Sequence, residues 1–336
     1  MKKLLEVEHL SVEYVTYAGR VRSVRDISFK LEDGKTTAFV GESGCGKSVT
    51  AKTLMGLIEK PGKVSEESQI IFKGENIEGY TQKQWNKFRG KNCSMIFQDA
   101  LVSLNPTMKI GKQMIENLKN HEEYKNLSQA KMNQKAEEFL KMTGIPDVKS
   151  CMKKYPHELS GGMRQRVMIA AAMITNPEIL IADEPTTALD VTIQEQILEL
   201  MKNLQKKFGM AIVMITHDLG VVADMADQII VMYAGKIVER GSCDDIFYEP
   251  KHPYTWSLLK SIPHIDQKEK TPLLSIEGEL PDMTDPPKGC AFCDRCPCAM
   301  NICRMYDPNE KDFGNGHKAA CWLLDERAKK IGGCLA

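Results

Sequence analysis

A glycine-rich loop is the segment of this chain whose residue types and spacing point most directly to chemistry. Gly41-Glu42-Ser43-Gly44-Cys45-Gly46-Lys47-Ser48 matches the pattern GxxxxGKS, between an apolar run and a helix-forming run. In such a loop, successive backbone N–H groups surround phosphate oxygens and the helix N-terminus adds positive potential. Lys47 would neutralise the β- and γ-phosphates, and the Ser48 hydroxyl would ligate Mg²⁺. The residues expected at a nucleoside triphosphate are Gly41, Ser43, Gly44, Cys45, Gly46, Lys47, Ser48 and Val49.

Two carboxylates follow a second apolar run later in the chain. Ile179 to Ala182 reads as a buried strand, and Asp183 and Glu184 come directly after it. At the carboxyl end of such a strand, Asp183 would hold Mg²⁺ and Glu184 would polarise an attacking water as general base. Together with the glycine-rich loop, this pair predicts a site that binds a nucleoside triphosphate with Mg²⁺ and activates water.

The string Leu159-Ser160-Gly161-Gly162-Met163-Arg164-Gln165-Arg166 lies between these two segments. A serine and two glycines before a helix form another phosphate cradle. The string closely resembles the signature of ATP-binding cassette (ABC) ATPases, and the resemblance covers about the first 250 residues. In that family, Ser160, Gly161 and Gly162 would bind the γ-phosphate of ATP held by the opposite subunit. ATP would then join two subunits and hydrolysis would release them, so a monomer should hydrolyse ATP poorly.

The resemblance also implies roles for four residues that would carry little weight alone. Gln98 resembles the Q-loop glutamine, which touches Mg²⁺ and water and couples the site to membrane subunits. His217 resembles the switch histidine that contacts the γ-phosphate. Asp190 resembles the D-loop residue at the dimer seam, and a role as helix N-cap is equally compatible. Tyr14 is the candidate for stacking on adenine, with Tyr17 three residues away.

Alternating elements are expected to position these residues. Short runs at 4–7, 10–14 and 27–31 indicate an antiparallel β-layer, and a buried strand at 36–40 leads through the loop into a helix from Ser48. A stretch from Lys109 to Gly144 favours helices. Strands at 179–182 and 211–215, with a helix at 191–208 between them, fit parallel strands joined by crossovers. The expected fold is α/β, a P-loop NTPase with a RecA-like core, the antiparallel β-layer and a helical signature subdomain at about 99–165.

Composition narrows the possible partners and compartment. The 336 residues carry 45 Lys plus Arg and 45 Asp plus Glu, which gives no global field for nucleic acid or an anionic membrane. The longest apolar runs, such as Val167 to Ile174, are far shorter than a membrane span requires. The N-terminus reaches acidic residues before any long apolar stretch, so it does not resemble a secretory signal. These features predict a cytoplasmic protein of about two domains, divided into 1–250 and a loop-rich, proline-containing extension at 251–336.

Three strings resemble the peptide-importer branch of ABC ATPases: Ser103 to Met108, Glu184 to Thr192, and His252-Pro253-Tyr254-Thr255. The resemblance implies an ATPase of the translocase class that energises uptake of dipeptides and oligopeptides. Import of nickel or another small solute by the same machinery is the alternative. The implied partners are a second ABC ATPase subunit, expected to form a heterodimer, two transmembrane permeases and an extracytoplasmic peptide-binding protein. The ATPase would lie at the cytoplasmic face of the membrane.

Six of the eleven cysteines fall between Cys290 and Cys321, a pattern more typical of a metal site than of disulfides in a cytosolic protein. Cys290, Cys296, Cys303 and Cys321 stand where this branch carries a C-terminal iron–sulfur motif, and thiolates suit a [4Fe–4S] cluster. Zinc is the alternative, because Cys293 and Cys296 form a CxxC pair and Cys298 offers another thiolate. Reduced thiols or disulfides without metal are the third possibility. A bound metal is expected to play a structural role, because the extension has little apolar sequence with which to fold on its own.

Overall fold

The computed structural model describes residues 3–17, 19–187, 189–261 and 276–328, and these divide into two compact units. The first unit contains residues 32–36 and 79–215, and the second contains 3–31, 37–78 and the described residues from 216 onward. Within the described residues, no helix combines the length and apolar character needed to cross a lipid bilayer.

An antiparallel sheet opens the second unit and confirms the expected β-layer. Its strand order is β2-β1-β5-β6, with β4 also paired to β1. The two apolar runs predicted as separate strands belong to one strand, in which His9 adopts a positive φ of +51°. The strands are β1 (Lys3–Thr16), β2 (Gly19–Glu32), β4 (Gly62–Val64), β5 (Gln69–Phe72) and β6 (Glu75–Asn76).

A second group of strands in the same unit carries the glycine-rich loop. β3 is buried along its whole length and pairs in parallel with β10, which pairs antiparallel with β11. Strand β13 of the C-terminal extension pairs with β11 through Glu239 and Ala319, and β12 pairs with β13. The extension therefore continues the sheet that contains β3. The strands are β3 (Thr36–Val40), β10 (Gln228–Tyr233), β11 (Lys236–Ser242), β12 (Glu310–Asp312) and β13 (Lys318–Ala320).

Helices of the second unit flank these strands. The loop leads into α1, which begins one residue earlier than predicted, and α11 starts the segment after Pro250 with His252 as its N-cap. The helices and 3₁₀ turns are α1 (Lys47–Leu54), α9 (Leu219–Met225), α10 (Cys243–Tyr248), α11 (Pro253–Lys260), η3 (Cys293–Arg295), α12 (Asn301–Met305) and η4 (Trp322–Leu324).

The first unit contains three parallel strands in the order β9-β8-β7. β8 (Ile179–Asp183) and β9 (Ala211–Ile215) are buried throughout, as the continuous apolar runs predicted. β7 (Cys93–Ile96) completes the set. Helix α8 (Val191–Phe208) crosses from β8 to β9, begins at the N-cap Asp190 and ends at Gly209, whose φ is +68°.

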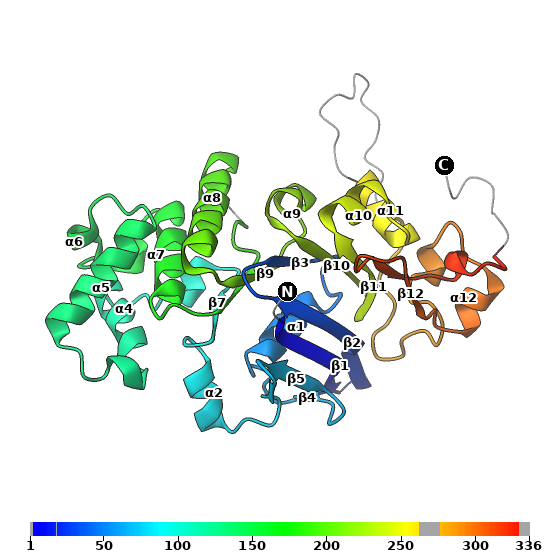
Figure 1. Ribbon diagram of the computed structural model, residues 1–336, viewed down its shortest axis with the longest axis horizontal. Helices are drawn as coiled ribbons and strands as arrows, with labels where there is room; N and C mark the ends of the chain where they lie inside the picture. Colours follow the sequence, from blue (N-terminus) through cyan, green and yellow to red (C-terminus); the bar gives the residue numbers. More distant parts are fainter. Residues whose placement is uncertain (1–2, 18, 188, 262–275, 329–336) are drawn as a thin grey trace, which may run out of the picture. The chain divides into compact units, whose positions relative to one another are not determined.

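A group of helices forms the remainder of the first unit; α4, α5, α6 and α7 lie together in Figure 1, whereas α2 lies apart from them. Helices α4 (Ile110–Lys119) and α5 (Gln129–Met142) confirm the helical stretch predicted between Lys109 and Gly144. The other members are α2 (Gln82–Phe88), α3 (Ala100–Ser103), η1 (Glu122–Tyr124), α6 (Val148–Cys151), η2 (Pro156–Glu158) and α7 (Gly161–Met173).

Candidate functional site

The glycine-rich loop joins β3 to α1 and contains three glycines whose positive φ is rare for residues with a side chain. Gly41, Gly44 and Gly46 have φ of +146°, +81° and +105°. A Cβ atom at Gly41 would lie 2.2 Å from the carbonyl oxygen of Met232. Backbone crowding and positive φ thus fix the loop in a curled conformation, which is the geometry that presents N–H groups to phosphate.

Lys47 is folded back over this loop. Its side chain is buried at 7% exposure, and its ammonium donates to the carbonyls of Gly41 at 2.6 Å and Glu42 at 2.9 Å. The sulfur of Cys45 lies 3.6 Å from the same nitrogen, and burial raises the pKa of the Cys45 thiol. Gly46 is the N-cap of α1 and supplies no side-chain cap, so the positive end of this helix lies beside the lysine. The arrangement concentrates positive potential where an anion would bind.

Asp183 and Glu184 stand at the carboxyl end of β8. Asp183 is 7% exposed, whereas Glu184 is half-buried and adopts a φ of +48°, which is uncommon for a residue with a side chain. The Glu184 carboxylate accepts hydrogen bonds from Gln98 Nε2 at 2.7 Å and from Thr187 Oγ1 at 2.9 Å. Its backbone N–H donates to the carbonyl of Ile215 at 2.8 Å. Glu184 is therefore held in a defined position by both its backbone and its side chain.

The signature string forms the start of α7. Ser160 is the N-cap, and its hydroxyl accepts a hydrogen bond from the Met163 N–H at 3.4 Å. Ser160 and Gly161 are exposed, while a Cβ at Gly162 would come within 3.0 Å of Ile193 on α8. The serine and the first glycine thus face outward, as binding to a nucleotide on another subunit would require.

Asp190 caps the next helix of the same unit. Its carboxylate accepts a hydrogen bond from the Ile193 N–H at 3.0 Å at the start of α8. The N-cap role weighed from sequence is confirmed, and the role at a dimer seam stays a prediction.

His217 and Tyr14 belong to the second unit. His217 is exposed and follows Thr216, whose N–H donates to the carbonyl of Phe39 on β3. It therefore lies at the end of β3 that carries the glycine-rich loop. Tyr14 is half-buried opposite Gly62, where a Cβ would come within 2.7 Å of its ring, whereas Tyr17 is fully exposed. Of the two tyrosines, only Tyr14 has a ring that the fold holds in place.

Sequence reasoning missed four residues around these sites. Thr187 bonds to Glu184, and Glu42 in the loop is bound by Arg295 and Tyr254. Tyr254 belongs to the string His252-Pro253-Tyr254-Thr255, which resembles the peptide-importer branch. Its spacing gives no indication of a contact with the glycine-rich loop. Arg295 is 253 positions from Glu42, so no local pattern could join them.

The cysteines of the extension gather in one region. The pKa of the Cys290 thiol is raised to about 12, first by burial and then by the nearby Cys321, Cys303 and Cys296. The Cys290 N–H also donates to the carbonyl of Cys303 at 2.8 Å. The four cysteines predicted as ligands are thus neighbours in the structure.

Neither zinc nor an iron–sulfur cluster is shown by this arrangement. Among the described residues, no three His, Cys, Asp or Glu side chains are placed to hold a single metal ion. Cys298, weighed as an extra ligand, forms a disulfide. Cys293 is buried beside the other thiols, and burial raises its pKa. The metal-binding character expected of the extension therefore remains a proposal.

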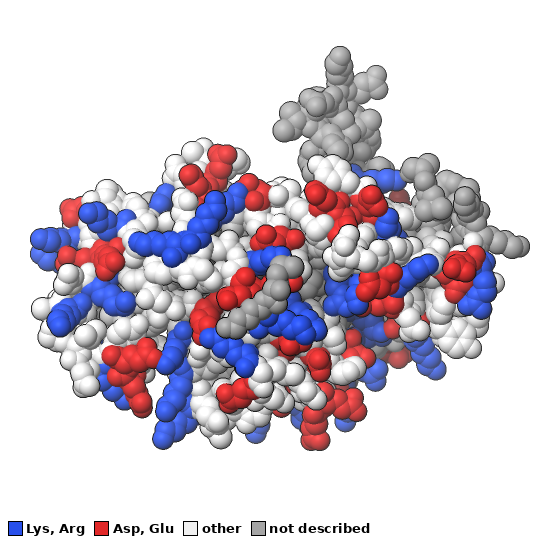
Figure 2. Space-filling model, viewed as in Figure 1, with Lys and Arg blue, Asp and Glu red and all other residues white. Residues whose placement is uncertain are grey.

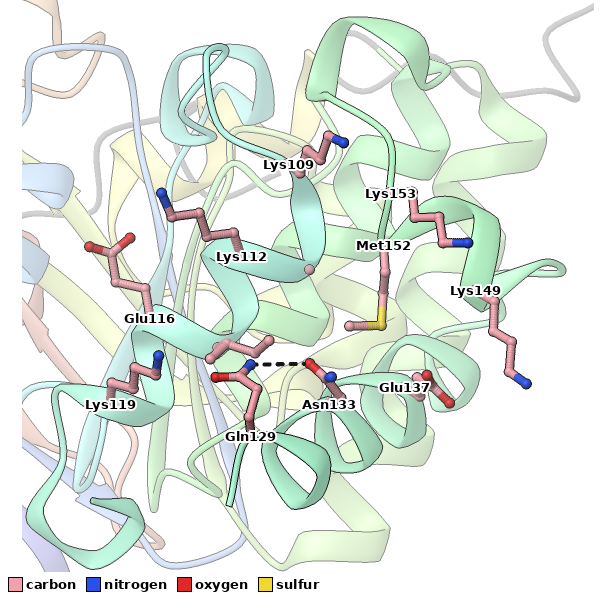
Figure 3. Close-up of a pocket in the computed structure, with 12 residues that line it drawn as sticks. Lys109, Lys112, Glu116, Lys119, Gln129, Asn133, Glu137, Lys149, Met152 and Lys153 are labelled. Atoms are coloured by element: carbon pink, nitrogen blue, oxygen red, sulfur yellow. Dashed lines mark hydrogen bonds between the residues drawn. The ribbon is translucent and has the colours of Figure 1, made fainter. Parts of the chain in front are cut away.

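A separate hollow lies among helices α4, α5 and α6 (Figure 3). It has a volume of about 700 Å³, and lysines 109, 112, 119, 149 and 153 line it, with Met152 in its wall. Gln129 donates a hydrogen bond to Asn133 at its edge. None of the predicted site residues lines this hollow.

Comparison with known proteins places the chain in a family. Residues 24–187 match the ABC transporter family, and residues 238–303 match the C-terminal region of oligopeptide/dipeptide transporters. The chain is 51% identical over 330 residues to the dipeptide transport ATP-binding protein DppD of Lactococcus lactis subsp. cremoris, covering 98% of this chain and 93% of that protein. The chain belongs to the ABC transporter family of ATP-binding proteins.

Other ABC proteins support the same placement. The oligopeptide transport ATP-binding protein OppD of Bacillus subtilis is 49% identical over 98% of this chain and 91% of its own length. The ABC transporter cassette MJ0796, solved as a dimer, superposes with a TM-score of 0.63 at 25% identity, over 71% of this chain and 99% of that one. The ABC fold predicted from the signature string is thus confirmed.

Proposed function

We propose that this ABC ATPase hydrolyses ATP to energise import of dipeptides and oligopeptides through membrane permeases. The observation that carries the proposal is likeness over nearly the full chain to ATP-binding proteins of dipeptide and oligopeptide transport, including the C-terminal region at 238–303. These relatives favour peptides over nickel as the cargo. Uptake of a labelled dipeptide, a labelled oligopeptide and nickel by cells with and without this subunit tests the choice. Loss of nickel uptake alone would contradict it.

For nucleotide binding, we propose that Lys47 and the backbone of residues 41–49 surround the triphosphate, while Tyr14 stacks on adenine. Ser48, Asp183 and Gln98 would hold Mg²⁺, which would supply positive charge to offset that of the phosphates. The curled loop and the buried, inward-folded Lys47 support this assignment. The Lys47 ammonium would exchange its two carbonyl partners for phosphate oxygens.

For hydrolysis, we propose that Glu184 accepts a proton from the attacking water as general base. Its carboxylate is aimed by Gln98 and Thr187, so the base is fixed before the reaction. His217 would contact the γ-phosphate from the end of β3. Positioning of this kind supplies most of the catalysis in phosphoryl transfer.

For assembly, we propose that Ser160, Gly161 and Gly162 bind the γ-phosphate of ATP held by a second ATPase subunit, with Asp190 at the seam. The exposure of Ser160 and Gly161 supports binding to a group outside this chain. The partner is expected to be a different ATPase, and two permeases and an extracytoplasmic peptide-binding protein complete the importer.

We propose that a hollow of about 640 Å³ in the first unit receives a permease segment. Its lining includes Phe97, next to Gln98, together with Met168, Asn117 and His121. Phe97 is 41% exposed. A permease helix seated there would contact the residue beside the Gln98–Glu184 hydrogen bond. Phe97→Asp should lower co-purification of the permease, and unchanged co-purification would contradict this seat.

The protein is expected at the cytoplasmic face of the membrane, held there by the permeases. Lysine, arginine, aspartate and glutamate are interspersed over the face seen in Figure 2. Such a surface gives no extended field of one sign for nucleic acid or lipid headgroups. It is compatible with docking to protein, and the ATPase should therefore leave the membrane fraction when the permeases are absent.

We propose that Cys290, Cys296, Cys303 and Cys321 hold a [4Fe–4S] cluster. The Cys290 thiol lies near those of Cys321, Cys303 and Cys296, and four cysteine thiolates are the usual ligand set of such a cluster. Bound metal would supply cross-links between the 290–303 segment and the end of β13. Anaerobically purified protein should be brown, absorb at about 400 nm and contain iron and sulfide. Colourless protein with stoichiometric zinc would contradict the cluster.

A further inference from the structure

The Glu42 side chain is clamped by an arginine from the C-terminal extension. Arg295 Nη1 lies 2.6 Å from Glu42 Oε2, and Nη2 lies 2.9 Å from Oε1. The Arg295 side chain is 6% exposed and that of Glu42 is 28% exposed. A paired guanidinium–carboxylate contact in a largely buried setting is among the strongest and most directional of polar interactions.

The rest of the guanidinium is also fully engaged. Nε donates to the carbonyl of Glu277 at 2.8 Å, and Nη2 donates to the carbonyl of Ile276 at 3.0 Å. Nη1 donates to the Tyr233 hydroxyl at 3.3 Å. With the two bonds to Glu42, all five N–H groups of Arg295 have an acceptor. Arg295 is therefore rigidly placed before any nucleotide binds.

A second contact holds the backbone of the same loop residue. The Glu42 N–H donates to the Tyr254 hydroxyl at 2.8 Å, and Tyr254 is completely buried. The Tyr254 ring packs on Phe292 at 5.3 Å and on Tyr233 at 4.7 Å, and Tyr233 packs on Phe292 at 5.1 Å. Phe292 and Arg295 both lie in the segment 290–303. This segment therefore supports both the side chain and the backbone of Glu42.

Glu42 in turn positions Lys47. The carbonyl of Glu42 accepts a hydrogen bond from Lys47 Nζ at 2.9 Å. A shift of Glu42 would therefore move the loop lysine and its neighbouring N–H groups. Ordering such a loop at the moment of binding would subtract from nucleotide affinity, whereas a loop already held in place avoids that loss.

We propose that Arg295 is a positioning residue for the glycine-rich loop, so that the C-terminal extension is a working part of the nucleotide site. The contact between Arg295 and Glu42 sets ATP affinity without touching ATP. This inference rests on the proposed function of the loop in binding ATP. It does not depend on which metal, if any, the cysteines hold.

The experiment measures the affinity of the full-length chain for a fluorescent ATP analogue, and KM and kcat in the assembled ATPase. Arg295→Ala should weaken affinity by about 10-fold or more, corresponding to about 1.4 kcal/mol, and should raise KM more than it lowers kcat. Arg295→Lys keeps the positive charge but loses the paired N–H groups that bind both carboxylate oxygens. Its affinity for the analogue should lie between those of Arg295→Ala and wild type. Glu42→Ala combined with Arg295→Ala should be no worse than Arg295→Ala alone, because both remove the same contact.

Two further variants provide an independent test and a control. Tyr254→Phe retains the packed ring and removes only the acceptor of the Glu42 N–H, so it should weaken affinity even if Arg295→Ala folds poorly. Arg304→Ala removes an exposed ion pair with Asp294 in the same segment and should bind like wild type.

The outcomes separate this inference from the proposed function. Lys47→Ala serves as the reference for loss of binding at the loop. If Lys47→Ala binds weakly while Arg295→Ala and Tyr254→Phe bind like wild type, the positioning role is overturned. If Lys47→Ala also binds like wild type, the loop is not the ATP site and the proposed function fails first.

Discussion

The side-chain amide of Gln98 donates a 2.7 Å hydrogen bond to the carboxylate of Glu184, 86 positions further along the chain. Gln98 follows β7 and Glu184 follows β8, and these strands are parallel neighbours, so their carboxyl ends meet at one edge. The bond joins the residue proposed to respond to the permeases with the residue proposed to activate water. Movement of the Gln98 loop would be transmitted directly to the base.

Glu184→Gln should abolish ATP turnover while ATP binding is retained. The amide keeps the size of the side chain but cannot accept a proton, and loss of a general base typically costs a factor of about 10² to 10⁴. ATPase assays and nucleotide-binding measurements on the same preparation check this. Glu195→Gln, an exposed position on α8, is the matched control and should retain full turnover. Turnover near that of wild type in the Glu184 variant would remove Glu184 from the mechanism.

Gln98→Ala should lower turnover by about tenfold, because Glu184 loses the donor that aims it. Gln98→Glu should also shift the pH profile. Two carboxylates at this distance raise the pKa of the pair, so the pH at which turnover reaches half its maximum should increase. Gln82→Ala removes a comparable exposed glutamine contact, to Asn86, and should leave both quantities unchanged. An unshifted profile in Gln98→Glu would argue against coupling between these residues.

Ser160→Asp should separate helix capping from nucleotide contact. Aspartate also caps helices well, so the stability of α7 should change little, whereas its charge would repel a γ-phosphate. Turnover of the assembled ATPase should therefore fall by at least about tenfold while the thermal midpoint is preserved. Ser128→Asp makes the same change at the N-cap of α5, where the serine also accepts a hydrogen bond from an N–H at 3.4 Å. This variant should leave both turnover and the thermal midpoint unchanged. Equal turnover in both variants would exclude Ser160 from the composite site.

His252 should make stability depend on pH. Complete burial lowers its pKa to about 3, from an ordinary value of 6.5. Between these values the unfolded chain binds a proton that the folded chain does not, so stability falls as pH decreases through this window, by about 1.4 kcal/mol per pH unit for this group.

His252→Asn isolates that contribution. Its side-chain oxygen can still accept the Tyr254 N–H as the histidine Nδ1 does, which keeps the cap of α11. Denaturant unfolding of both proteins at several pH values between 6.5 and 3 should show a smaller slope for the variant, by about one proton. Identical slopes would show that His252 is already protonated in the folded state.

The bounds of helices and strands could be predicted best from the sequence where local residues determine where an element begins and ends. Helix α8 has the predicted bounds because Asp190 caps its start and Gly209 ends it, and β9 has them because its run is continuously apolar. The continuity of β1 through His9 could not be predicted, since a positive φ in a non-glycine residue leaves no clear sequence signal. The polar residues between the runs 4–7 and 10–14 predict a break that the structure does not contain.

The contacts that bring the extension to the site could not be predicted. The pairing of β13 with β11 and the clamp of Arg295 on Glu42 join segments far apart in the chain. Such contacts arise from tertiary packing, which spacing alone does not encode. In the same way, cysteine spacing selected the four neighbouring thiols but not the disulfide of Cys298.

The most direct test of the account is sedimentation of the Glu184→Gln chain with its partner ATPase subunit, with and without Mg-ATP. We expect association that requires ATP and is lost when either Lys47→Ala or Ser160→Asp is added. Association that is independent of nucleotide, or that survives both substitutions, would contradict the claim that ATP is bound between the glycine-rich loop of one subunit and the signature turn of another.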